Sequence, residues 1–237
     1  DASTRVARNA AGLIEDGDCL QAGIGTLPSA LLAQLAGRRD LGVHSGIVGD
    51  ATARLIESGV ITGVRKPAHH PRAVTAYLAG TALTYALAER GALAVRTPDF
   101  THDASVMAQI DRFVSIGAAL EVDLLGQVHA EHLGGRAISG SGGFVDFVRG
   151  ARLSPGGRAI VMLQSTNRDR TQSRIRATLP PGTPVTCART DVDIVVTEHG
   201  VASLRHLSVA QRAQRLIEIA DPAFRDELAR AWEALPR

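Results

Sequence analysis

The fold of this chain is decided by the stretch CLQAGIGTLP, residues 19–28, in which a short apolar run leads into two glycines and a proline. The run at 19–22 predicts a buried strand, and Pro28 suits the first turn of a helix that extends to about Leu35. Strand, glycine turn and helix together make half of a βαβ unit. The chain is therefore predicted to be α/β from this strand onward.

The same alternation of apolar runs and helical patterns continues outward from this unit. It predicts strands at 41–44, 74–78, 112–116, 120–123, 159–163 and 194–197, and helices at 51–57, 82–90, 209–220 and 222–235. A helix before the first strand is expected to end at Asp16-Gly17. These elements predict an α/β fold with a mainly parallel or mixed sheet flanked by helices. A boundary is expected in the loop at 62–72, which gives two parts, 1–70 and 71–237; a boundary between Pro98 and Asp103 is the alternative.

Composition limits the possible functions. The chain of 237 residues is 45% hydrophobic but only 3% aromatic, so aliphatic side chains must fill the core. The formal net charge of +2 argues against nucleic acid or an anionic membrane as partner. No apolar run reaches the roughly 18 residues of a membrane span, and no signal peptide is visible, so a cytoplasmic protein is expected. Cys19 and Cys187 fit neither a disulfide framework nor a metal site and are expected to be buried.

Two glycine-rich turns are candidates for ligand binding. Gly23 and Gly25 precede a predicted helix, where backbone N–H groups can meet a phosphate, a carboxylate or a developing oxyanion. A tight turn without any ligand fits these two glycines as well. The second turn, within SGSGGFVDFVRGA at 139–151, has enough glycine to approach a ligand closely before a helix begins. On that helix Arg149 and Arg152 lie one turn apart and could meet a phosphate.

Carboxylates and histidines give weaker signals. Glu121 and Asp123 share one face of a predicted strand, and each would disfavour the charge of the other if both were buried. A solvated strand face, or a pair that caps backbone N–H groups, is the alternative. The pairs His69-His70 and His129/His132 show no metal-site spacing and are expected at the surface or in a hairpin, so no metal site is predicted.

Four stretches resemble the acetyl-CoA hydrolase and butyryl-CoA/4-hydroxybutyrate CoA-transferase family. They are QAGIGTLP at 21–28, LGVHSGIVGD at 41–50, LEVDLLGQV at 120–128 and SGSGGFVDFVRGA at 139–151. The resemblance covers nearly the whole chain and implies a CoA-transferase-like layered fold. It makes residues 1–70 the end of the family's first α/β half and residues 71–237 its C-terminal domain. It also implies an acyl-CoA substrate, with coenzyme A as a cosubstrate and no tightly bound cofactor.

The resemblance also assigns provisional roles to particular residues. Those expected to line the thioester or hold the CoA portion are Gly23, Gly25, Gln127, Gly140, Gly142, Gly143 and Arg149. The acyl-accepting glutamate of the family falls at Gly46. A glycine offers no nucleophile for covalent catalysis, so the usual route through an acyl-glutamyl intermediate is missing. The residues left as candidates for the chemistry, each needing hydrogen-bond reach to the reacting group, are His44, Ser45, Asp50 and Glu121.

Three hypotheses follow from Gly46. The leading one is an acyl-CoA enzyme that acts on a CoA thioester by hydrolysis or acyl/CoA transfer, with altered chemistry. The second is a catalytically silent acyl-CoA-binding subunit that pairs with an active copy or a separate N-terminal half; a homo-oligomer or such a pairing is expected. An unrelated nucleotide-binding domain is disfavoured, because the next predicted strand ends at His44 and not at an acidic residue. The first two require Gly46 and both glycine turns to surround one cleft.

Overall fold

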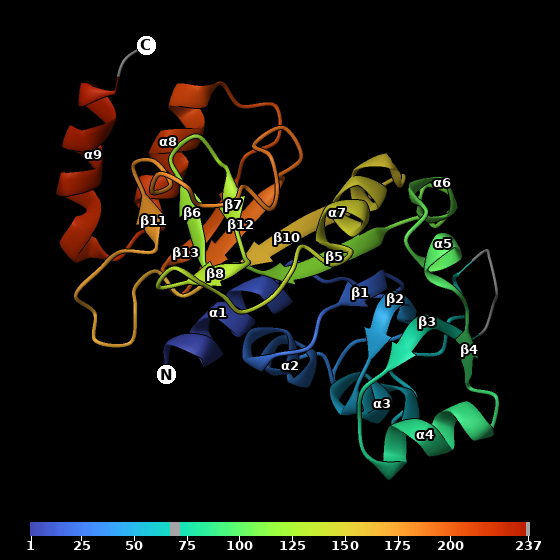
Figure 1. The fold of residues 1–237 in the computed structure, drawn as a ribbon. Coiled ribbons are helices and arrows are strands. Elements are labelled where there is room, and N and C mark those ends of the chain that lie inside the picture. The colour runs from blue at the N-terminus through green and yellow to red at the C-terminus, as the bar shows by residue number, and fades with distance from the viewer. Residues whose placement is uncertain (67–71, 236–237) are drawn as a thin grey trace.

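The computed structural model describes residues 1–66 and 72–235 and is built on one large sheet (Figure 1). The strand order is β13-β12-β10-β5-β1-β2-β3-β4. The bounds are β1 (Cys19–Ala22), β2 (Gly42–Val48), β3 (Ala73–Leu78), β4 (Leu93–Val95), β5 (Phe113–Ala118), β10 (Arg158–Met162), β12 (Ile194–Thr197) and β13 (Gly200–Ser203). Strand β13 pairs antiparallel with β12, and the other neighbours in this order pair in parallel. The predicted α/β class and mixed, mainly parallel sheet are confirmed.

Helices cover both faces of the sheet (Figure 1). One face carries α1 (Ala2–Ala11), α2 (Thr26–Ala33), α3 (Asp50–Glu57) and α4 (Ala82–Glu89). The opposite face carries α5 (Pro98–Thr101), α6 (Ala104–Met107), α7 (Phe144–Leu153) and α8 (Val209–Glu218), followed by the 3₁₀ turn η1 (Pro222–Phe224) and α9 (Arg225–Ala234). Because both faces are covered, the central strands read as continuous apolar runs.

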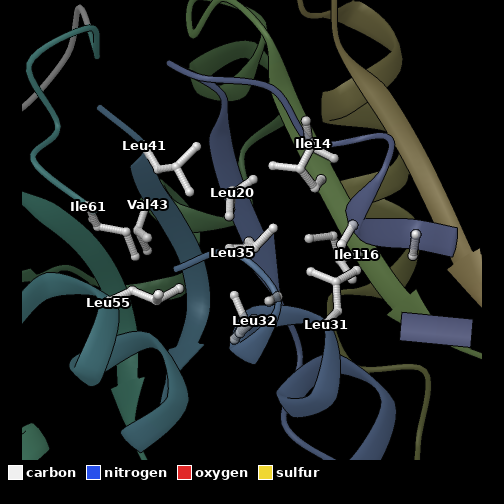
Figure 2. Packing of buried hydrophobic residues seen from close by; sticks show 14 of the residues in the cluster. Ile14, Leu20, Leu31, Leu32, Leu35, Leu41, Val43, Leu55, Ile61 and Ile116 are labelled. Carbon is white, nitrogen blue, oxygen red and sulfur yellow. The ribbon is translucent and has the colours of Figure 1, made fainter. Parts of the chain in front are cut away.

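Alternation along each strand divides the buried side chains between two cores. In β1, Leu20 points into the core under α2, where Leu31 and Leu35 meet it (Figure 2), whereas Cys19 points into the core on the α7 side. In β5, Phe113 joins Cys19. This two-core packing follows from the period of two in a strand. The same alternation determines which side chains of β2 face α5 and α7.

The winding of the chain changes direction at β1. From β1 it proceeds through β2 and β3 to the edge strand β4, and it then returns so that β5 pairs with the other side of β1. The loops that leave β1 and β5 therefore diverge at the carboxyl ends of these strands. In open α/β sheets a crevice forms at such a point and is where ligands bind.

Two small sheets stand beside the large one. Strand β6 (Glu121–Asp123) pairs antiparallel with β7 (Val128–His129) and parallel with β11 (Ile175–Arg176). Strands β8 (His132–Leu133) and β9 (Arg136–Ala137) form a short hairpin. The predicted hairpin-like alternation near 128–132 thus belongs to two neighbouring pairings.

Several predicted boundaries were wrong. The first helix ends at Ala11 and not at Asp16, because the chain turns after Gly12 while Ile14 continues into the core. Strand β2 runs on to Val48, where it still pairs with β3 at Leu78; the small residues after His44 hid this extension from a pattern search. The last predicted helix opens with a separate 3₁₀ turn. The strands β4, β11 and β13 and the helices α5 and α6 were not predicted.

The predicted division of the chain is not reproduced as a break in the sheet. Strands β1 and β2, from before residue 70, lie side by side in the same sheet, between β5 and β3 from after residue 70. The division at 70 stays a prediction about the family's two halves. The His69-His70 pair lies outside the described residues.

Candidate active site

A cavity of about 480 Å³ lies at the carboxyl ends of β1 and β5. Its lining combines the turn after β1, the end of β2, the end of β5 and the loop before α7. The lining residues are Gln21, Gly23, Ile24, Pro28, Gly46, Ile47, Tyr77, His102, Ser115, Ile116, Gly117, Ala118, Ala130, Ser139, Gly140, Ser141, Gly142, Gly143, Phe144 and Phe147. The structure therefore brings Gly46 together with both glycine turns around one cavity.

The loop before α7 offers backbone donors to this cavity. Within the described residues, the N–H groups of Gly140, Ser141, Gly142 and Gly143 donate no hydrogen bond. Gly142 adopts a φ of +50°, in the left-handed region that glycine reaches without strain. Successive unused N–H groups in such a turn suit an anion or a developing oxyanion. In the first turn, by contrast, the N–H of Gly23 already donates to the carbonyl of Ile116.

The space beside Gly46 is filled by a histidine that the sequence did not single out. A methyl carbon built on Gly46 would lie 2.9 Å from Nε2 of His102 and 3.2 Å from Cε2 of Phe147. A methyl carbon on Gly143 would also overlap the His102 ring. His102 is thus held between two glycines, and its imidazole occupies the volume that a side chain at position 46 would need.

The environment of His102 is mostly apolar. It follows α5, and its ring centroid lies 4.6 Å from that of Phe147 on α7. Its Nδ1 lies 2.9 Å from the Thr101 hydroxyl. Sequence reasoning missed this residue because α5 is a short helix without a strong pattern. No local signal links it to Gly46, which the fold alone places beside it.

The two residues that precede Gly46 in β2 lie outside the lining. His44 is 1% exposed, and its Nε2 lies 3.0 Å from the carbonyl of Thr101. Its ring also lies between Phe100 and Phe113, with centroids at 5.9 and 6.1 Å. Ser45 is buried, and its hydroxyl donates to the carbonyl of Ile47 at 2.8 Å. Both side chains therefore have structural partners.

Asp50 lies in a neighbouring hollow of about 310 Å³ that also touches Gly23. Its Oδ1 accepts from the backbone N–H of Thr81 at 2.9 Å and from the hydroxyl of Thr84 at 2.7 Å. These hydrogen bonds, the backbone one first, lower the pKa of the Asp50 carboxyl. The carboxylate thereby holds the start of α4 beside α3.

Glu121 lines a different cavity, of about 580 Å³, beside β6, β8 and the loop at 180–183. Its Oε1 accepts from Nε of Arg176 at 2.8 Å and from Nη2 at 2.6 Å. Asp123 is 0% exposed and accepts from the backbone N–H and the side-chain amide of Gln127 at 2.8 and 2.6 Å. The two carboxylates therefore have separate partners, and Gln127 serves the turn between β6 and β7.

The remaining candidates also have partners. Arg149 projects from α7 with a side chain 59% exposed, and its Nε donates to Asp191 at 3.0 Å. His129 is buried in its hairpin rather than on the surface, with its Nδ1 2.9 Å from the Pro184 carbonyl. Cys19 and Cys187 are free and buried as predicted, and burial raises the pKa of each thiol to about 12. Gly25, at a φ of +128°, stands at the start of α2 behind the lining.

Fold and site together define an open α/β domain with a ligand cavity at its switch point. The profile of the acetyl-CoA hydrolase/transferase C-terminal domain matches residues 80–232. The 4-hydroxybutyrate coenzyme A transferase of Clostridium kluyveri is 41% identical over 229 residues, which are 96% of this chain and 53% of that protein. The butyryl-CoA:acetate CoA-transferase of Anaerostipes caccae is 41% identical over 98% of this chain and 54% of that one.

Solved structures similar to this chain point to the same family as the sequence matches. RipA from Yersinia pestis superposes with a TM-score of 0.92 at 40% identity, covering 98% of this chain and 52% of that chain. A 4-hydroxybutyrate CoA-transferase from Porphyromonas gingivalis gives 0.85 at 38% identity, covering 97% and 55%. The chain belongs to the acetyl-CoA hydrolase/CoA-transferase family. It spans about half the length of these relatives.

Two further findings complete the description of the site. In residues 1–66 and 72–235, no helix is long and apolar enough to cross a membrane. The same residues contain no group of three or more His, Cys, Asp or Glu side chains that could hold a metal ion.

Proposed function

We propose that this chain binds an acyl-CoA and acts on its thioester by hydrolysis or acyl/CoA transfer, with chemistry altered at Gly46. The observation that carries the proposal is the lining of the cavity. Gly46, Gly23 and the 140–143 turn meet there, and none of the described lining residues is Asp, Glu, Lys or Arg. The cavity keeps the glycine walls of an acyl-CoA site and lacks a carboxylate to take the acyl group.

We expect the reaction in this cavity to differ from carboxylate-mediated transfer, because no described lining residue carries a carboxylate. In hydrolysis, the oxygen of a water adds to the thioester carbonyl, and the CoA sulfur leaves with the electrons of the broken C–S bond. The negative charge that grows on the carbonyl oxygen needs fixed donors. The unused N–H groups of Gly140 to Gly143 are suitable donors at the cavity wall. They equally suit the CoA portion, as the family resemblance suggests.

The other residues predicted to take part in catalysis or CoA binding differ in whether they touch this cavity. His44, Ser45, Asp50 and Glu121 lie outside the cavity lining, as do Gln127 and Arg149. They stay predictions, with no contact to the cavity in their support. Because the chain spans about half of its relatives, we propose that a complete site includes a second chain, either another copy or a separate N-terminal half. Coenzyme A enters as a cosubstrate.

A silent acyl-CoA-binding subunit is the second candidate. The His102 ring fills the volume beside Gly46, so the cavity could hold the CoA portion of a ligand without a reacting acyl group. This function would need an active partner chain. It predicts binding without turnover.

Incubation with acetyl-CoA and butyryl-CoA, followed by free-thiol assay and calorimetry, separates the two candidates. Thiol release above the protein-free rate supports the enzyme, whereas binding without release supports the silent subunit. Absence of both binding and release would refute the proposal. Hydroxylamine trapping with mass spectrometry should find no glutamyl thioester in the protein, and a glutamyl-CoA adduct would contradict the altered chemistry.

A further inference from the structure

We propose that His102 is the catalytic base of this site and that the reaction it serves is hydrolysis of the acyl-CoA thioester by water. The inference rests on the proposed function and goes beyond it by choosing the reaction and the residue. It replaces the candidates near Gly46 in sequence with a residue that only the fold brings there.

His102 occupies the space next to Gly46. Its Nε2 atom lies 2.9 Å from the position that a Cβ atom on residue 46 would take, so the imidazole and a longer side chain at position 46 would compete for the same volume. A glutamate in that slot would present its carboxylate to the thioester. In this chain the same slot presents an imidazole from the opposite wall, between Gly46 and Gly143. A nitrogen lone pair therefore takes over the place of the missing carboxylate.

His102 also has the chemistry that a general base needs. Among the described lining residues, only His102 and Tyr77 carry a titratable side chain. Imidazole is the usual general base of enzymes, since its charge state changes near neutral pH. Of the lining hydroxyls, that of Ser115 is already committed to Gln21 at 2.9 Å. The Ser139 hydroxyl donates to the carbonyl oxygens of Ala130 and Gly140. Ser141 and Tyr77 also bring hydroxyls to the lining, but a hydroxyl is a far weaker base than imidazole, so His102 is the suitable base within this cavity.

The Thr101 hydroxyl can hold His102 in the tautomer that a base needs. Its oxygen lies 2.9 Å from Nδ1 of His102 and 3.5 Å from the carbonyl oxygen of Thr97. When this hydroxyl accepts from Nδ1–H, the unprotonated nitrogen of the ring is Nε2. Within residues 1–66 and 72–235, no side chain or backbone group hydrogen-bonds to it. An unprotonated nitrogen at a cavity wall can accept a proton from a bound water.

Hydrolysis of the thioester needs no reactant other than water. Nε2 takes one proton from water while the water oxygen bonds to the thioester carbon, giving a tetrahedral intermediate with negative charge on the former carbonyl oxygen. The intermediate collapses, the C–S bond breaks, and the sulfur leaves with its electron pair. The imidazolium returns the proton to the sulfur. The products are a carboxylic acid and free CoA thiol.

The test compares His102→Gln with His206→Asn. His206 is exposed and has a φ of +62°, which asparagine tolerates, so this control removes one imidazole without strain. On the protein at its natural length, thiol release from acetyl-CoA and butyryl-CoA is measured beside calorimetric binding of the same compounds. We expect His102→Gln to lose 10²- to 10⁴-fold in release, a typical loss for a general base. Its affinity should change by less than about threefold, and His206→Asn should match the wild type.

His102→Ala provides an independent arm that does not depend on Gln folding or packing well. It opens a space beside Phe147 that free imidazole can enter. Imidazole added to His102→Ala should restore at least tenfold of the lost rate, whereas it should leave His206→Asn unchanged. Circular dichroism verifies that both variants are folded.

The outcomes separate this inference from the proposed function. Thiol release in the wild type that persists in His102→Gln within threefold would overturn the role of His102 and leave the thioester enzyme standing. An acyl-histidine adduct at residue 102 would overturn the base role in favour of direct attack. Binding without release in the wild type would overturn hydrolysis and support the silent subunit. Absence of binding and release would remove both proposals.

Discussion

The cavity beside Gly46 and the cavity beside Glu121 differ in the kind of side chains that line them. The first, of about 480 Å³, is walled by glycines and aromatic rings. The second, of about 580 Å³, is lined by Glu121, Arg174 and Arg176 with two histidines. The carboxylate candidate Glu121 belongs to the second cavity. Gly46 and the two glycine turns meet at the first, where the strands of the large sheet end.

The reason for the difference is that charged groups stabilise structure as readily as they perform chemistry. Glu121 holds β6 to β11 through Arg176, and Asp123 holds a turn. Glycines leave backbone donors and open volume, which a ligand or a distant side chain can use. The charged residues Glu121 and Asp123 therefore did not lead to the cavity that contains Gly46.

The largest effect should come from placing a carboxylate at residue 46 in the first cavity. In Gly46→Glu alone, the new side chain and His102 compete for one volume. We expect little activity from this variant and loss of stability. In Gly46→Glu combined with His102→Ser, we expect a CoA adduct at residue 46 on incubation with acetyl-CoA, detected by mass spectrometry. His102→Ser alone is the control, and an equal adduct in it would show that residue 46 is not the acceptor.

Removing the buried carboxylate of Asp123, next to the second cavity, should lower the free energy of unfolding without changing the catalytic activity. Asp123→Ala leaves two backbone N–H groups, of Leu125 and Gln127, without their acceptor. We expect the free energy of unfolding to fall by about 3 kcal/mol, measured by urea titration. The exposed Asp111→Asn should change it by less than about 0.5 kcal/mol. Equal effects of the two would show that the buried hydrogen bonds add nothing.

Crowding the first cavity should give an intermediate effect. The methyl group of Gly143→Ala would overlap His102 and Phe147. We expect a loss of about 1–3 kcal/mol in unfolding free energy, as in other overpacked cores. In the His102→Ser background the same change should cost less by at least about 0.5 kcal/mol, because the overlapping ring is gone. Additive effects would mean that His102 does not lie against Gly143.

The smallest effect is expected from the ion pair of Glu121 with Arg176 in the second cavity. In Glu121→Gln the partly exposed pair with Arg176 is broken, and we expect a loss of about 1 kcal/mol or less in stability. Thiol release from acetyl-CoA should stay within twofold of the wild type, with Asp111→Asn as the matched control. A tenfold or greater drop in release would break the distinction between the two cavities and return Glu121 to the chemistry.

Much of the fold could be predicted because its signals are local. The apolar run at 19–22 and its glycine turn identified β1 and α2, and β12 (Ile194–Thr197) was predicted with its observed bounds. Short elements such as β4 and α5 were missed, since their few residues carry little periodicity. The extension of β2 through Gly46 was missed because its stability comes from pairing with β3, not from its own residues.

The sequence by itself determined the α/β class, the glycine turns and the absence of a carboxylate at position 46. These are properties of residue type and spacing along the chain. Only the tertiary structure decided that His102 lies against Gly46 and that Glu121 belongs to another cavity. The physical reason is that contacts between α5, β2 and α7 depend on how the sheet winds, and side chains from distant segments meet only after that winding is complete.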